Sequence, residues 1–175
     1  KKSQEELRAR QPWFEDEMCF GTRTVVGKRW TACGYRPKCP MKYGFSYNYL
    51  YQATHPSTGN TFSMLLPRMD GQCFTLFIEA FTKAYPNACL IMDNAGNHKT
   101  TLSDELREKV SIEFLSPYSP DFNPQERMFQ EIKKALKGKF FNEIEPIEKL
   151  VSDKVIELSQ NKDKVKSLTA WQWIA

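Results

Sequence analysis

Ala88-Cys89-Leu90-Ile91-Met92-Asp93 is a short apolar run that ends in a carboxylate. The five apolar residues show no alternation between two faces, which is typical of a strand buried on both sides. A helical pattern over 72–85 precedes the run, and Pro86 stops that helix. The sequence therefore predicts a central buried strand over 88–92, with Asp93 at its carboxyl end.

The residues before this run predict a series of strands. Residues 13–20 alternate with a period of two. One face of that strand carries Phe14, Asp16, Met18 and Phe20. Further strands are expected over 24–31, 43–54 and 61–66. The row of tyrosines at 43–51 fits the core side of a strand, and a base-stacking platform is the alternative.

The residues after the run predict alternating helices and strands. The expected elements are a helix over 101–109, a strand over 110–115, a helix over 124–137 and a helix from Pro146 to about Ser159. A short helix over 3–10 is also expected. Strands in series suit antiparallel pairing, whereas strands separated by helices need parallel pairing. This order predicts an α/β fold, a ribonuclease H-like mixed sheet of three antiparallel strands and then parallel strands, with helices on both faces.

The length of 175 residues is enough for one domain with a substantial core. We expect a single domain over 1–175, with its core at about 13–140 and a helical extension over 141–175. The apolar fraction of 41% includes no run long enough to span a membrane. The charged start is unlike a secretory signal, so it is interpreted as an internal start, such as that of the second half of a longer chain.

The charge of the chain is unevenly distributed. The net charge is +4, yet residues 1–43 carry ten Lys and Arg against five acids. This bias favours a polyanionic partner, with a solvated basic face as the alternative. The five cysteines include no Cys-x-x-Cys pair, so the sequence disfavours structural zinc and favours reduced thiols.

Three acids indicate a divalent-metal site. Asp16 interrupts an apolar strand face, where an unpaired carboxylate would be costly, so a cation partner is expected. If strands 13–20 and 88–92 are neighbours, Asp16 and Asp93 can share an ion, and Glu126 in the first turn of a helix can complete the cage. Two such ions would clamp the attacking and leaving oxygens of a phosphoryl displacement. Glu15 and Glu17 are rivals to Asp16, and Asp93 has a turn-capping alternative.

The helix over 124–137 has two interpretations. Glu126, Gln130, Lys133 and Lys137 share one face. A carboxylate followed by lysines suits a metal site beside a phosphate backbone, whereas the lysines could also be an ordinary solvated face. Glu126 alternatively closes a capping box, with Asn123 as the N-cap and Pro124 as the first helical residue.

Three blocks of this sequence resemble the signature blocks of mariner-superfamily DDE transposases, most closely the bacterial insertion-sequence branch. They are Phe14-Glu15-Asp16-Glu17, then Leu90-Ile91-Met92-Asp93-Asn94-Ala95-Gly96-Asn97-His98, then the stretch from Ser116 to Glu126. The segments Gly27-Lys28-Arg29-Trp30 and Gly34-Tyr35-Arg36-Pro37 are also similar to that group. The resemblance covers about residues 13–140, and the third block is the most specific.

The resemblance implies a ribonuclease H-like catalytic domain that cuts DNA at transposon ends and transfers the strand to target DNA. By motif position its catalytic and metal-binding triad is Asp16, Asp93 and Glu126, used with two Mg²⁺ or Mn²⁺ ions. The DNA-binding candidates are Lys133, Lys137, Arg127 and His98; for His98 a solvent-facing loop position is the alternative. A homodimer on paired ends is implied, in a bacterial cytoplasm or nucleoid. The family's amino-terminal DNA-binding region is expected to be absent from this chain.

Two other functions fit the same residues. One is a structure-specific nuclease or ribonuclease H-like enzyme without joining activity. The other is a domesticated, non-catalytic DNA-binding protein, against which the presence of all three acids argues. A serine or tyrosine recombinase fits poorly, because an Arg/His set that would clamp a phosphate is not evident.

Overall fold

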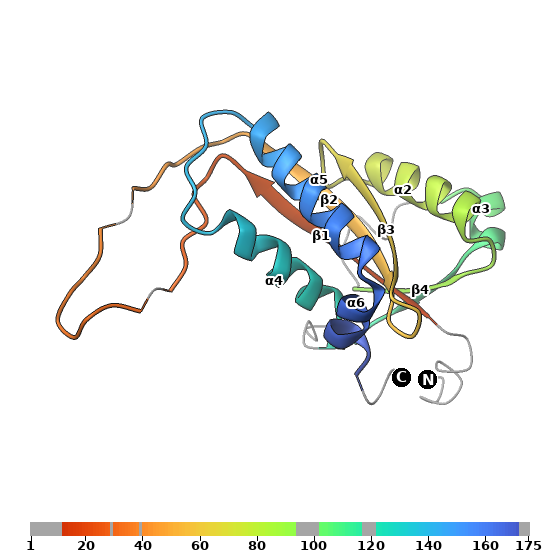
Figure 1. Cartoon of the computed structure of the whole chain (residues 1–175). Coiled ribbons are helices and arrows are strands. Elements are labelled where there is room, and N and C mark those ends of the chain that lie inside the picture. The colour runs from red at the N-terminus through yellow and green to blue at the C-terminus, as the bar shows by residue number, and fades with distance from the viewer. Residues whose placement is uncertain (1–11, 29, 39, 94–101, 117–121, 172–175) are drawn as a thin grey trace.

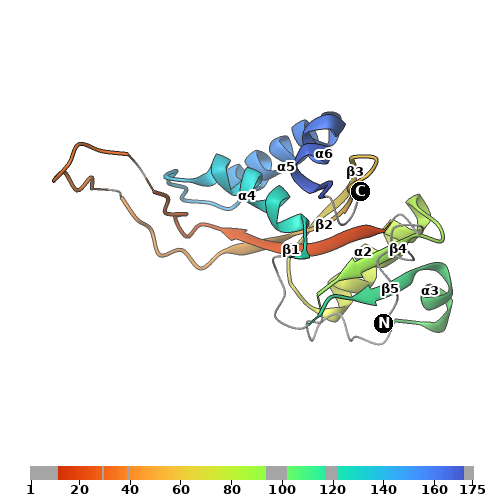
Figure 2. The ribbon, with the colours of Figure 1, turned by 90° about the horizontal axis from the view of Figure 1, so that it is seen from below.

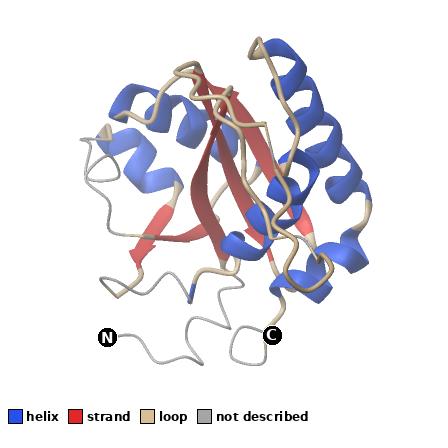
Figure 3. Cartoon of the chain, turned by 90° about the vertical axis from the view of Figure 1, so that its left-hand side faces the viewer, coloured by secondary structure: helices blue, strands red, loops and turns tan. Residues whose placement is uncertain are grey.

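A five-stranded mixed sheet forms the centre of the molecule (Figures 1 and 3). The computed structural model describes residues 12–28, 30–38, 40–93, 102–116 and 122–171. The strands are β1 (Trp13–Gly21), β2 (Tyr47–His55), β3 (Asn60–Leu66), β4 (Cys89–Met92) and β5 (Ser111–Phe114), in the spatial order β3-β2-β1-β4-β5. β1, β2 and β3 pair antiparallel, whereas β4 is parallel to both β1 and β5. The predicted ribonuclease H-like mixed sheet is confirmed.

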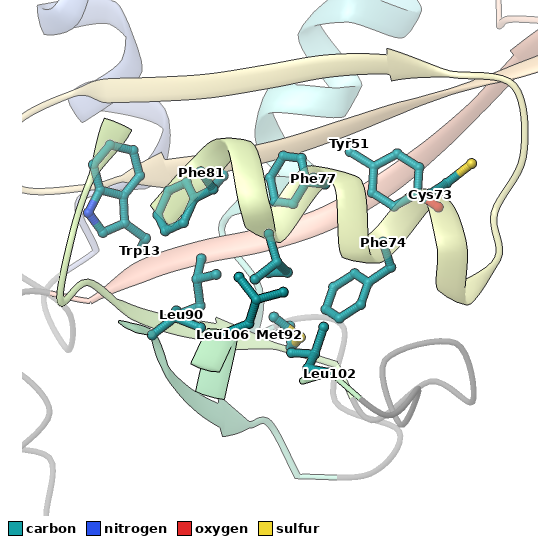
Figure 4. Packing of buried hydrophobic residues seen from close by; sticks show 13 residues of the cluster. Trp13, Tyr51, Cys73, Phe74, Phe77, Phe81, Leu90, Met92, Leu102 and Leu106 are labelled. Carbon is teal, nitrogen blue, oxygen red and sulfur yellow. The ribbon is translucent and has the colours of Figure 1, made fainter. Parts of the chain in front are cut away.

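Helices cover both faces of this sheet (Figure 2). They are α2 (Gly71–Ala84), α3 (Asp104–Lys109), α4 (Gln125–Leu136), α5 (Glu145–Gln160) and α6 (Lys162–Thr169). The α2 side holds an aromatic core in which Trp13, Phe77 and Phe81 are almost completely buried (Figure 4). Asp70 starts α2 by accepting a hydrogen bond from the Cys73 amide at 2.9 Å. Burial of these rings, rather than helix propensity, holds α2 against the sheet.

A second core lies between the opposite sheet face and α4, α5 and α6. Met18 and Leu50 contribute from the sheet, and Met128, Ile132 and Val151 from the helices. The five are at most 2% exposed. The strand face that carries Met18 also carries Asp16, so this packing places α4 over the carboxylate side of β1.

The segment between β1 and β2 is an extended arm and contradicts the predicted strand over 24–31 (Figure 1). Among its described residues, two backbone hydrogen bonds join the two sides of the arm at its base: the Thr22 amide donates to the Ser46 carbonyl at 3.0 Å, and the Thr24 amide donates to the Lys42 carbonyl at 3.1 Å. Val25 at the base of the arm packs against the second core, whereas apolar residues farther out have no sheet against which to pack: Trp30 is 100% exposed and Phe45 is 88% exposed. β2 consequently starts at Tyr47 rather than 43.

The remaining differences lie at the ends of elements. The predicted helices over 72–85 and 124–137 and the predicted strand over 110–115 are present within one residue at each end, and that over 101–109 begins at Asp104. The sequence predicts no helix after about Ser159, yet α6 follows Asn161, whose side chain accepts a hydrogen bond from the Lys164 amide at 3.0 Å. The predicted helix over 3–10 lies outside the described residues.

Candidate active site

Asp16 lies in the middle of β1, the central strand of the sheet. Alternation places it on the α4 side with Phe14 and Met18, and it places Glu15 and Glu17 on the α2 side. Glu15 is completely buried, whereas Asp16 keeps part of its surface accessible. Of these three neighbouring acids, Asp16 is therefore the one that faces α4.

Asp93 follows the last residue of β4 and is exposed. β1 and β4 are hydrogen-bonded neighbours, with Phe14 opposite Ile91. Continuing that parallel register by two residues brings Asp93 opposite Asp16, on the same face of the sheet. The two carboxylates were expected to share an ion if their strands were neighbours. β1 and β4 are neighbours in the sheet.

Glu126 is the second residue of α4, and its side chain is partly exposed. The first turn of this helix is capped by Asn123, whose side-chain oxygen accepts from the Gln125 amide at 3.1 Å and whose carbonyl accepts from the Glu126 amide at 3.2 Å. Among the described residues, the return bond of a capping box, from the Asn123 amide to the Glu126 carboxylate, is not formed. The Glu126 carboxylate is thus not used to cap its own helix.

Asn123 also joins the start of α4 to β1. It is 2% exposed, and its side-chain nitrogen donates to Asp16 Oδ2 at 3.3 Å and to the Glu15 carbonyl at 3.1 Å. The sequence identified Asn123 only as a helix cap. Its contact with a carboxylate 107 residues away depends on how α4 packs across the sheet, which the sequence does not reveal.

The three acids affect one another electrostatically. Burial, together with the negative charges of Glu17, Glu126 and Asp93, raises the pKa of Asp16 from 3.8 to about 7. A hydrogen bond of 2.8 Å from the Glu17 amide to Asp16 Oδ1 opposes this shift. Repulsion from Glu126 and Asp93 shows that α4 and the end of β4 direct negative charge toward the same carboxylate.

The donor set suits a hard divalent cation, because carboxylate oxygens are the ligands that Mg²⁺ and Mn²⁺ prefer. In the described part of the chain, no three His, Cys, Asp or Glu side chains are close enough together to enclose an ion. The closed cage expected from the sequence is therefore not preformed. A cation drawn toward Asp16 would instead relieve the repulsion that raises the pKa of this carboxyl group.

The DNA-binding candidates near α4 are at different places: Arg127 and Lys133 lie within the helix, and Lys137 follows its last residue. Arg127 is exposed, whereas Lys133 is partly buried near β1. Burial raises the pKa of the Cys19 thiol on β1, and the positive charge of Lys133 opposes this shift. Lys137 comes directly after α4 and packs against Gly27 in the arm. A Cβ added to Gly27 would lie 3.0 Å from Lys137 Cδ. His98 lies outside the described residues.

Residues 11–148 match the family model for the DDE superfamily endonuclease. The chain belongs to this family. The match includes β1, β4 and α4, and so all three acids. The sequence resemblance to DDE transposases is confirmed at this level. No curated protein matches the chain significantly.

Solved structures of low sequence identity share this fold. The Mos1 mariner paired-end complex with Mn is 15% identical, with a TM-score of 0.59, over 96% of this chain and 61% of that one. The catalytic domain of Mos1 mariner transposase is 14% identical, with a TM-score of 0.55, over 94% and 88%. The catalytic core domain of BIV integrase is 15% identical, with a TM-score of 0.51, over 85% and 82%.

The matches to Mos1 cover different shares of the two solved chains. This chain spans only about three fifths of the Mos1 chain in the paired-end complex, but most of the isolated Mos1 catalytic domain. It therefore has the fold of the catalytic domain. Among the described residues, no helix is long and apolar enough to cross a membrane.

Proposed function

We propose that this chain is the catalytic domain of a bacterial mariner-superfamily transposase that cuts DNA at transposon ends and joins the freed 3′-hydroxyl to target DNA. The observation that carries the proposal is that the negative charges of Glu126 on α4 and of Asp93 after β4 both raise the pKa of Asp16 on β1. Membership of an endonuclease family supports the cleavage step. We propose that it acts in the cytoplasm on nucleoid DNA, with residues 13–140 as the catalytic core and 141–175 as a helical extension.

Asp16, Asp93 and Glu126 would hold two Mg²⁺ or Mn²⁺ ions. When bound, such ions activate the attacking water or 3′-hydroxyl and stabilise the departing oxygen. The chain itself supplies a rigid strand for Asp16, and Asn123 holds Asp16 Oδ2 beside the start of α4. Arg127, Lys133 and Lys137 would contact the phosphate backbone next to Glu126, and His98 would do so after Asp93.

A pre-cut transposon end separates this function from that of a nuclease without joining activity. Given an end with a free 3′-hydroxyl, a target plasmid and Mg²⁺, a transposase containing this chain is expected to produce joined molecules. Gel analysis of the plasmid checks the result. Cleavage of uncut ends without any joining of pre-cut ends would contradict the strand-transfer part of the proposal.

The arm supports a homodimer on paired ends. One chain supplies one set of the three acids, whereas two ends must be cut. Trp30 and Phe45 are 100% and 88% exposed on an arm that extends away from the sheet, and contact with a second copy would remove these rings from water (Figure 1). The proposed occupant of the arm is the partner chain of the dimer.

Serine at Trp30 or Phe45 is expected to weaken assembly of the two-ended complex by about 30-fold or more, because buried aromatic anchors dominate interface energies. Mass photometry of the complex with end DNA measures the ratio of two-chain to one-chain species. Leu76→Ser is the matched control, since Leu76 is 52% exposed but lies on α2. Unchanged assembly of both arm variants would exclude the arm as the dimer contact.

A further inference from the structure

Two glutamines form a buried bridge between the sheet and α4. Gln52 on β2 and Gln125 at the start of α4 are both 0% exposed. The Gln125 side-chain nitrogen donates to Gln52 Oε1 at 2.5 Å. The Gln52 side-chain nitrogen donates in turn to Ser63 Oγ on β3, at 2.9 Å. Three polar side chains are therefore linked in series, and the step from Gln125 to Gln52 crosses the mostly apolar layer between the sheet and the helix.

The bridge is a costly way to attach a helix. Neighbouring positions at the same interface use apolar side chains such as Met128 and Leu50, which need no hydrogen bonds. Gln125 Oε1 has no hydrogen-bond partner among the described residues. Packing alone would be served better by an apolar residue, because a buried polar atom without a partner is unfavourable. The hydrogen bond between the two amides instead fixes the direction and distance between β2 and the start of α4.

The position of the bridge is next to two of the three acids. Gln52 is the register partner of Asp16 in the β1–β2 pair, and Gln125 directly precedes Glu126. Asn123 adds a second connection, because its side chain donates to Asp16 Oδ2 at 3.3 Å and accepts from the Gln125 amide at 3.1 Å. The same few atoms thus connect the strand that carries Asp16 with the helical turn that carries Glu126.

We propose that Gln52 and Gln125, together with Ser63 and Asn123, are positioning residues that set the separation of the Asp16 and Glu126 carboxylates. This proposal rests on the proposed roles of the two acids. Since the metal cage is not preformed in the described residues, the distance between its ligands depends on how α4 is held. The bridge fixes the N-terminal end of α4, and the apolar core fixes the rest of the helix.

Gln125→Met tests the proposal, because methionine keeps the length and volume of the side chain but removes the hydrogen bonds. In a transposase containing this chain, the rate of Mg²⁺-dependent end cleavage is expected to fall about 100-fold, as expected for ångström-scale misplacement of a catalytic group. The affinity for end DNA should not change. The Mn²⁺ concentration that half-saturates the protein, measured by calorimetry, should rise. The thermal unfolding midpoint should stay the same or increase.

Gln52→Met breaks the same bridge from the sheet and should give the same loss. The double variant should lose no more than either single variant, because the two residues act through one bond. Should Gln125→Met fail to fold, Gln52→Met provides the test. Thr82→Val is the control, since Thr82 is a buried polar residue on α2 whose hydrogen bonds within the described part of the chain go to its own helix. The cleavage rate of this variant should equal that of the wild type.

Wild-type cleavage and Mn²⁺ affinity in both methionine variants would overturn the proposal. So would a loss of stability accompanied by an unchanged rate, because that result describes a purely structural bridge. Glu126→Gln separates this failure from failure of the proposed function. If Glu126→Gln abolishes cleavage while Gln125→Met does not, only the positioning role is wrong; if Glu126→Gln cleaves normally, the assignment of the acids is wrong.

Discussion

Replacing Asp93 by asparagine is expected to lower the rate of Mg²⁺-dependent cleavage of transposon-end DNA by about 1,000-fold or more. The substitution removes one negative charge from the site but keeps the shape of the side chain. A metal ion stabilises the negative charge of the transition state by several kcal/mol. The expected fall in rate follows from the loss of that stabilisation. Asp93 is exposed at the end of β4, so the fold should not change.

The measurement is single-turnover cleavage of labelled end DNA, with joining of a pre-cut end assayed in parallel. Both steps should fail together, because the same ions serve both. Asp104→Asn is the matched control: Asp104 is an exposed aspartate in the first turn of α3, outside the proposed site. Cleavage by Asp93→Asn within a few fold of the wild type would remove Asp93 from the proposed catalytic residues.

Strand periodicity was sufficient to predict the position of Asp16. The face that it shares with Phe14 and Met18 is the face on which α4 packs, and the apolar run over 88–92 became β4, beside β1. These predictions succeed because burial imposes a period of two on a half-buried strand and removes that period from a central one. The order of strands and helices then restricts the sheet to few topologies.

The arm and the amide network could not be predicted in this way. Val25, Val26 and Trp30 have strand propensity, but the arm extends beyond the sheet, so tertiary context overrides that propensity. Gln52 offered a faint signal, as a polar residue in the half of β2 that is buried at both faces. Its partner Gln125 is 73 residues away, and no local pattern specifies that distance.

The two interpretations of Glu126 show why a sequence pattern alone is insufficient. Asn-Pro-x-Glu fits a capping box, and it fits a metal ligand in the first turn equally well. The structure gives the capping task to the Asn123 side chain and carbonyl and leaves the Glu126 carboxylate near Asp16. The distinction depends on side-chain directions that only the packed helix defines.

Asp16→Asn is expected to stabilise the metal-free protein at pH 8 while abolishing cleavage. In the folded chain the pKa of Asp16 is about 7, against 3.8 for the ordinary side chain. Between these values the folded state holds a proton that the unfolded state releases, so stability falls as the pH rises from about 4 to about 7 and remains low above it. Asparagine carries no such charge, and its side-chain oxygen can still accept from the Glu17 amide. At pH 8 the free energy of unfolding of the variant should therefore be roughly 2–4 kcal/mol higher than that of the wild type.

Urea unfolding in EDTA at pH 8 and at pH 3 measures this difference, which should nearly disappear at the lower pH because that pH lies below the pKa of Asp16 in both the folded and the unfolded state, so the carboxyl group is largely protonated in both. Adding Mg²⁺ or Mn²⁺ at pH 8 should stabilise the wild type and leave Asp16→Asn almost unchanged, because an ion that binds only the folded site raises its stability. Equal stability of the two proteins at pH 8 would mean that Asp16 is not under the electrostatic strain described. A variant that is more stable yet inactive would instead indicate that the fold tolerates a destabilised carboxylate because that carboxylate binds the cation.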